Sequence, residues 1–111
     1  MSSEYTWKIT HIANNDIDDT LSYIADILSN KTAAKKLFVS LNTTIENICN
    51  FPMAYPGCEY YYISDTNYRH AIIGNYILFY RINEPLKQIE ILRFLYSGKN
   101  VTQAHISSEG E

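Results

Sequence analysis

The sequence contains little that would interrupt secondary structure, cross-link a small protein or anchor it in a membrane. Its 111 residues include four glycines, three prolines and two cysteines. No run approaches the ~18 apolar residues that a membrane span needs, and the N-terminus lacks the apolar core of a signal peptide. We therefore expect one cytoplasmic domain over residues 1–111, with no membrane partner and a flexible end at residues 104–111.

Cysteine and histidine are too scarce and too scattered to predict a metal site. Cys49 and Cys58 match no metal-binding spacing, and without an export signal we expect both to be reduced and partly buried. The three histidines are far apart in the sequence: His11, His70 and His105. The residues therefore predict no metal ligand set.

Positive charge is also scarce. The chain has nine Lys and Arg residues against 12 Asp and Glu, which gives a formal net charge of −3 at pH 7. Binding to nucleic acid usually requires a domain-wide excess of basic residues, because each neutralised phosphate adds to the affinity. The composition does not reach that level, although residues 67–100 are locally basic and residues 4–26 are acidic.

Tyrosine, by contrast, is abundant, with ten residues. Broad aromatic side chains pack well across the strands of a sheet and are also enriched on surfaces that bind partners. We favour packing as the main use. Four of these tyrosines fall in residues 51–67, a stretch with two prolines and a glycine that predicts a long loop. These four residues could cover the helices or face a partner.

The N-terminal third predicts a strand followed by a helix. Polar and apolar residues alternate over residues 5–12, which is typical of a half-buried strand. Asn14 or Asn15 is the expected cap of the helix, with three acidic residues in its first turn, where they favour the helix dipole. These acidic residues are Asp16, Asp18 and Asp19. Neighbouring carboxylates on different sides of a helix make a catalytic carboxylate pair improbable.

Two apolar stripes with helical spacing predict an antiparallel helix hairpin. The first ends near Asn30 and Thr32 is the expected cap of the second, so only about two residues separate them. The first stripe consists of Ile17, Leu21, Ile24 and Leu28, and the second of Ala34, Leu37, Leu41, Ile45 and Ile48.

From Tyr68 onward the sequence predicts a three-stranded meander. A two-residue loop at residues 74–75 places Arg69 opposite Tyr80 and Tyr68 opposite Arg81. Arginine and tyrosine pair readily across strands, so Tyr80 is the expected packing neighbour of Arg69.

A second loop, at residues 84–87, places Arg81 opposite Glu90 and Leu78 opposite Arg93. The alternation of side chains then predicts the two faces of the sheet. One face carries Arg69, Tyr76, Tyr80 and Arg93, and the other carries Arg81, Glu90, Ile72, Ile77, Phe79, Leu92 and Phe94.

The order β-α-α-β-β-β, with the segments "FP", "YR", "GNYILFYRI" and "ILRFLYSGKN", resembles the RelE/ParE superfamily of toxins from type II toxin-antitoxin modules. The resemblance covers residues 5 to about 103 and is closer to ParE. It implies an α+β fold in which an antiparallel sheet packs against the helix hairpin.

The superfamily has two activities, which need different residues. One branch cuts messenger RNA in the ribosome, and the ParE-like branch poisons DNA gyrase. RNA cleavage needs several cations around the phosphate and a group that transfers protons. The RNA-cleaving relatives carry an arginine on the third strand, where this chain has Ile77, and Ala71 stands at a second basic position. The resemblance therefore favours a toxin that acts by binding gyrase.

The resemblance also implies a set of target-binding residues, which would be the catalytic set if the chain were a ribonuclease. The set consists of Arg69, Arg93, Tyr96 and Lys99. Two of these positions depart from the ParE pattern, because Tyr96 replaces a histidine and Lys99 replaces an arginine.

The partners follow from the same resemblance. We expect a separate antitoxin whose C-terminal segment wraps over the sheet and the helix hairpin, and a role in growth inhibition and plasmid stabilisation. The expected target is DNA gyrase, and the alternative is the ribosome with its mRNA. A third interpretation is an inactive relative kept as a binding module. The resemblance requires neither a metal nor an organic cofactor.

Overall fold

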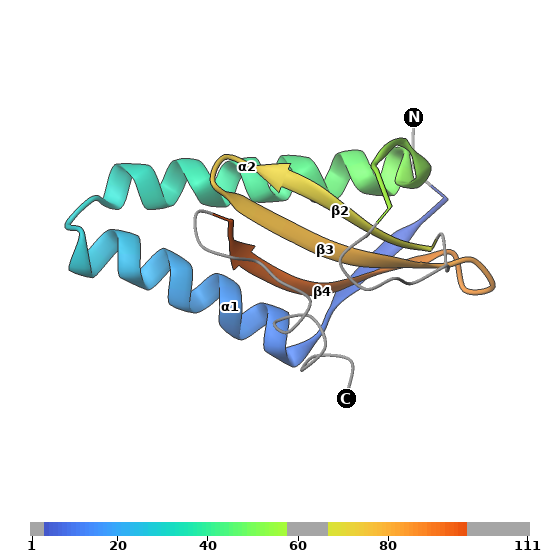
Figure 1. Ribbon diagram of the computed structural model, residues 1–111, viewed down its shortest axis with the longest axis horizontal. Helices are drawn as coiled ribbons and strands as arrows, with labels where there is room; N and C mark the ends of the chain where they lie inside the picture. The colour runs from blue at the N-terminus through green and yellow to red at the C-terminus, as the bar shows by residue number, and fades with distance from the viewer. Residues whose placement is uncertain (1–3, 58–66, 98–111) are drawn as a thin grey trace.

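The computed structural model describes residues 4–57 and 67–97, which form a four-stranded sheet and a helix hairpin (Figure 1). Lys99, His105 and Cys58 lie outside the described residues, as does the end at 104–111. The elements in chain order are β1 (Thr6–Ile9), α1 (His11–Ser22), the π-helical turn η1 (Tyr23–Ile27), α2 (Lys31–Asn50), the 3-10 turn η2 (Pro52–Ala54), β2 (Tyr68–Ile73), β3 (Tyr76–Asn83) and β4 (Gln88–Tyr96).

The sheet is mixed, with the strand order β1-β4-β3-β2. Strands β2, β3 and β4 form the predicted antiparallel meander, but β1 pairs with β4 in parallel. The backbone N–H groups of Thr6 and Thr10 donate to the carbonyls of Lys87 and Ile91 at 3.1 and 3.0 Å. Parallel neighbours need a long crossover, which the helix hairpin and the first two meander strands supply. The α+β prediction is confirmed, and the wholly antiparallel sheet is corrected to a mixed one.

The predicted pairing of β2 with β3 is confirmed, with Arg69 opposite Tyr80 and Tyr68 opposite Arg81. The pairing of β3 with β4 begins as predicted, with Arg81 opposite Glu90.

A β-bulge then shifts the register between β3 and β4. Tyr80 lies opposite Ile91, but its neighbour Phe79 lies opposite Arg93, so β4 has one extra residue at this point. The predicted pairing of Leu78 with Arg93 is therefore wrong, since Leu78 faces Phe94. A bulge sends the following side chains to the opposite face, which explains why Phe94 packs in the main core.

The main core lies between the helix hairpin and one face of the sheet. Both predicted stripes contribute to it, as Ile17 and Leu41 show. Leu28, however, is exposed. Its N–H donates to the carbonyl of Tyr23, five residues earlier, at 3.0 Å. This π-helical spacing rotates Leu28 out of the stripe. Cys49 is buried on α2, as expected. Among residues 4–57 and 67–97, no helix combines the length and the apolar character needed to cross a membrane.

Both helices begin earlier than predicted. The Thr10 hydroxyl accepts the N–H of Ala13 at 3.0 Å, so Thr10 caps α1 instead of Asn14 or Asn15. Asn30 caps α2 in the same way instead of Thr32. The first turn of α1 consequently holds no acidic residue. The interaction predicted between the aspartates and the helix dipole is therefore wrong, and at least one aspartate has a different role.

Candidate functional site

The structure does not gather the predicted site residues into one pocket. Arg69 lies on β2 beside the segment that follows α2, Arg93 lies at the bulge of β4 beside α1, and Tyr96 ends β4. Each of the three contacts a different part of the fold. The fourth residue, Lys99, lies outside the described residues.

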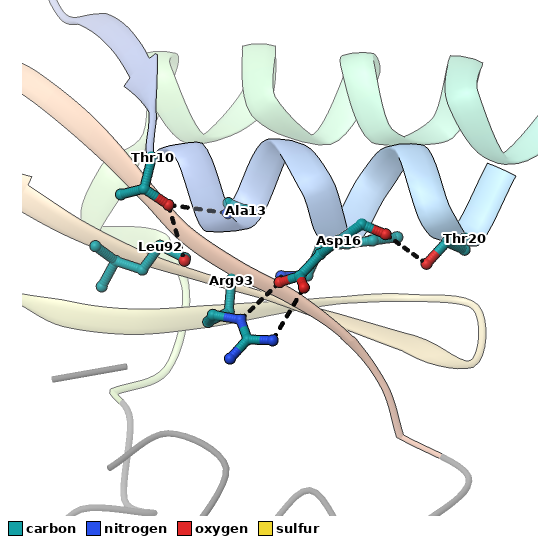
Figure 2. Close-up of polar contacts among 7 residues, drawn as sticks. Thr10, Ala13, Asp16, Thr20, Leu92 and Arg93 are labelled. Atoms are coloured by element: carbon teal, nitrogen blue, oxygen red, sulfur yellow. Dashed lines mark hydrogen bonds and ion pairs between the residues drawn. The ribbon is translucent and has the colours of Figure 1, made fainter. Parts of the chain in front are cut away.

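Asp16 of α1 binds one edge of the Arg93 guanidinium with both of its carboxylate oxygens (Figure 2). Its Nε donates to Oδ2 at 2.6 Å and its Nη2 donates to Oδ1 at 2.9 Å. The Asp16 Oδ2 also accepts the backbone N–H of Phe94 at 3.1 Å. The side chains of Arg93 and Asp16 are only 15% and 14% exposed. Bidentate pairs of this kind are strong and well oriented, so Arg93 ties β4 to α1.

The start of α1 positions this ion pair. The Thr10 hydroxyl caps the helix and also donates to the carbonyl of Leu92 at 3.1 Å, which fixes the first turn against β4 (Figure 2). Asp16 then reaches the N–H of Phe94, just past the last residue of β4 that β1 pairs. The sequence showed Asp16 only as one of three acidic residues, and nothing in its spacing pointed to Arg93.

Arg69 binds backbone carbonyls. Its Nη1 donates to the carbonyl of Tyr55 at 2.6 Å and to that of Met53 at 3.3 Å. Its Nε–H is buried and has no hydrogen-bond partner among the described residues. The same segment runs along the outer edge of β2, where the N–H of His70 donates to the carbonyl of Pro56 at 3.1 Å. Arg69 thus holds this segment on the sheet while keeping its full positive charge.

Tyr80, the cross-strand neighbour of Arg69, binds the same segment. Its hydroxyl donates to the carbonyl of Pro52 at 2.7 Å, and its ring meets that of Tyr55 edge-on at 6.2 Å. Burial raises the pKa of Tyr80 far above its usual range, and the nearby charge of Arg69 offsets only part of this rise. Tyr80 therefore remains a protonated hydrogen-bond donor and cannot transfer protons near neutral pH.

Tyr96 belongs to a group of three tyrosines from three elements, which we call the tyrosine cluster: Tyr23 of η1, Tyr76 of β3 and Tyr96 of β4. The rings of Tyr76 and Tyr96 lie 5.5 Å apart, and Tyr76 stacks on Phe94 at 5.2 Å. Burial raises the pKa of Tyr76, and the hydroxyls of Tyr96 and Tyr23 raise it further. Tyr96 is 51% exposed and Tyr23 is 52% exposed. Sequence reasoning missed Tyr23 because its partners lie more than fifty residues away.

Ile77 is the second residue of β3, at the position where the resemblance implies an arginine in the RNA-cleaving relatives. It is 5% exposed and packs with Phe79 on the face of the sheet opposite the main core. On the same face Arg81 Nη1 donates to Glu90 at 2.9 Å, which confirms the predicted pair. Burial acts to raise the pKa of Glu90, but the hydrogen bonds from Asn83 and Arg81 outweigh it and lower that pKa below its usual value.

The three arginines are all bound within the fold. Of the three arginines, Arg81 and Arg93 pair with carboxylates and Arg69 binds carbonyls elsewhere. In the described part of the chain, no three His, Cys, Asp or Glu side chains gather as metal ligands.

The chain is similar to known toxins both in sequence profile and in fold. A family profile described as the ParE toxin of the type II toxin-antitoxin system, parDE, matches residues 8–101. No curated protein matches. A chain of the chromosomal ParDE toxin-antitoxin system from P. aeruginosa shares the fold with a TM-score of 0.65 and 18% identity, over 86% of this chain and 98% of that one. A chain of the toxin-antitoxin complex RelBE2 from Mycobacterium tuberculosis shares it with a TM-score of 0.57 and 17% identity, over 83% and 96%. Since the profile spans most of the sequence, the chain belongs to the ParE toxin family of type II toxin-antitoxin systems.

Proposed function

We propose that this toxin inhibits growth by binding DNA gyrase and that it does not cleave RNA. The observation that carries the proposal is the buried Ile77 in the middle strand, at the place of a catalytic arginine. An aliphatic side chain neither binds a phosphate nor stabilises the charge that develops during RNA cleavage.

The arrangement of the remaining cations supports binding over cleavage. Arg93 forms an ion pair with Asp16. Arg69 and Tyr80 instead donate hydrogen bonds to backbone carbonyls of η2. The two guanidinium groups are thus bound to different elements of the fold. The formal net charge of −3 also suits a protein target better than ribosomal RNA.

The tyrosine cluster is our proposed contact with the target. Tyrosine is enriched at protein interfaces and among the residues that dominate their binding energy. Tyr96 and Tyr23 are half-exposed. Tyr76 packs against Tyr96 and itself stacks on Phe94. Lys99 remains a predicted contact. The pairing of Arg93 with Asp16 favours a structural role for Arg93 instead.

We also propose that a separate antitoxin holds the toxin inactive by covering its sheet and helix hairpin. Both structural relatives come from toxin-antitoxin complexes. Several large apolar side chains of the hairpin are exposed, including Ile27, Phe38 and Val39. An amphipathic segment of a partner would bury such side chains.

A pair of assays with the purified toxin tests the proposal. We expect the toxin to inhibit supercoiling by gyrase and to leave mRNA intact on translating ribosomes. Tyr96→Ala should weaken the inhibition by about 30-fold, the loss typical of an interface hot spot. Trp7→Ala is the matched control, because Trp7 is a similarly exposed aromatic residue on β1. Cleavage of mRNA within codons, with gyrase unaffected, would overturn the proposal.

A further inference from the structure

Arg69 differs from the other two arginines in what surrounds its charge. Arg81 and Arg93 each lie within 3 Å of a carboxylate oxygen, at 2.9 and 2.6 Å. Among the described residues, Arg69 donates to the carbonyls of Met53 and Tyr55. Carbonyl groups orient a guanidinium but leave its unit charge uncompensated. The Nε–H of Arg69 is also buried without a partner among the described residues.

Two exposed apolar side chains belong to the segment that Arg69 binds. Phe51 ends α2 and is 67% exposed, and Met53 in η2 is 57% exposed. Arg69 binds the carbonyl of Met53 directly, so the cation and the two apolar residues belong to one local structure, which we call the Arg69 surface. Arginine, phenylalanine and methionine are the residue types that interfaces favour.

Within the described part of the chain, the Arg69 surface therefore combines a cation that has no carboxylate beside it with two exposed apolar side chains. A carboxylate compensates a guanidinium best, because its two oxygens match the fork of N–H groups. Apolar residues on either side of that carboxylate would contact Phe51 and Met53. Phosphate groups of a nucleic acid would satisfy the cation but would leave the two apolar side chains in water.

We propose that the Arg69 surface binds a segment of the antitoxin in which a carboxylate is flanked by apolar side chains. The inference rests on the antitoxin partner proposed above and adds the place and the chemistry of one contact. A long-lived partner suits this surface better than a transient target, because permanent interfaces are the more apolar ones. The antitoxin thus supplies an anion that residues 4–57 and 67–97 of the toxin do not place beside Arg69.

The test measures the affinity of the toxin for its cognate antitoxin, after the two proteins are purified together and then separated. Arg69→Met removes the charge but keeps a similar volume, and it should weaken binding by about 30-fold. Arg69→Lys should give an intermediate loss because it keeps the charge without the fork. Phe51→Ser should weaken binding by about tenfold while leaving the fold intact, since the side chain is exposed. Arg81→Met is the matched control, because Arg81 already has Glu90 as its anion.

Two further measurements separate this inference from the proposed target. Binding of the antitoxin is measured without gyrase, so a failure of the gyrase proposal does not affect the result. Inhibition of gyrase by Phe51→Ser toxin should equal that of the wild type, because Phe51 is not among the predicted target-binding residues. Wild-type affinity of both Arg69→Met and Phe51→Ser for the antitoxin would overturn the inference. An equal loss of affinity with Arg81→Met, or a loss of gyrase inhibition with antitoxin binding intact, would overturn it too.

Discussion

Tyr80 and Arg69 are neighbours across two strands, and both donate to carbonyl groups of one short segment. The segment begins where α2 ends, so its carbonyls lack the partners that a continuing helix would provide. The sequence predicted that the two side chains face each other, because hairpin geometry fixes cross-strand pairs. It did not predict their partners, since no local pattern shows that residues 52–55 fold back over β2.

The buried hydroxyl of Tyr80 gives a prediction at the residue scale. Tyr80→Phe should lower the free energy of unfolding at neutral pH by about 1–2 kcal/mol, because the carbonyl of Pro52 loses its donor. Above pH ~10 an unfolded tyrosine loses its proton, whereas the raised pKa keeps native Tyr80 protonated. The unfolded state then binds fewer protons, so stability falls as the pH rises.

Urea unfolding of wild type and Tyr80→Phe between pH 8 and 11 measures both effects. The wild type should lose more stability over this range than the variant. Equal losses in the two proteins would contradict the burial of an un-ionised hydroxyl at this position.

At the scale of elements, α1 is joined to β4 by polar contacts as well as by packing. Thr10 connects the first turn to Leu92, and Asp16 connects the next turns to Arg93 and Phe94 (Figure 2). These contacts follow the parallel pairing of β1 and continue along the same edge of β4. A helix therefore satisfies backbone groups that a longer β1 would otherwise have paired.

Removing the charge of Asp16 should weaken this junction. Asp16→Asn removes the charged partner of the mostly buried guanidinium of Arg93, and we expect a loss of about 3 kcal/mol in the free energy of unfolding. Asp19→Asn is the control, because it makes the same change on an exposed face of α1. The double variant Asp16→Asn, Arg93→Met should recover part of the loss. Chemical denaturation of the wild type, of Asp16→Asn, of Arg93→Met and of the double variant measures the coupling, and purely additive losses would rule out the ion pair.

The sequence predicted the identity of most elements but not their exact connections. Helical periodicity in α2 and alternation in β2 and β3 are strong signals, because burial of one face imposes them. The bulge that redirects Phe94 leaves no such signal, since every residue around it suits a strand. The sequence does not identify Thr10 as a cap, because the alternating strand pattern continues through it. The parallel pairing of β1 is a long-range contact, which local sequence patterns do not encode.

At the scale of the whole molecule, two of the three arginines in the sheet, Arg81 and Arg93, pair with carboxylates. The predicted site residues depended on family resemblance, and the resemblance located positions without showing their partners. Asp16 is the clearest case, because it lies 77 residues from Arg93 in the sequence. The tyrosine cluster likewise combines residues from three distant segments. Sites of this kind become visible only when the fold brings the segments together.

Cell growth measures the combined effect of the toxin and its antitoxin. Expression of the chain alone should arrest growth, and co-expression of its antitoxin should restore it, because the partner covers the surfaces that reach the target. Colony counts with and without the antitoxin measure the effect. Unimpaired growth at a confirmed level of folded toxin would show instead an inactive relative kept for binding.

The parallel contact between β1 and β4 also determines when the sheet can form during synthesis of the chain. Thr10 and Leu92 meet although 82 residues separate them. A ribosome adding 5–20 residues per second therefore needs roughly 4–16 s after producing the first strand before its neighbour exists. During that interval the nascent chain cannot complete its sheet. The sheet that carries Arg69, Tyr80 and Arg93 can therefore close only after the ribosome has synthesised β4.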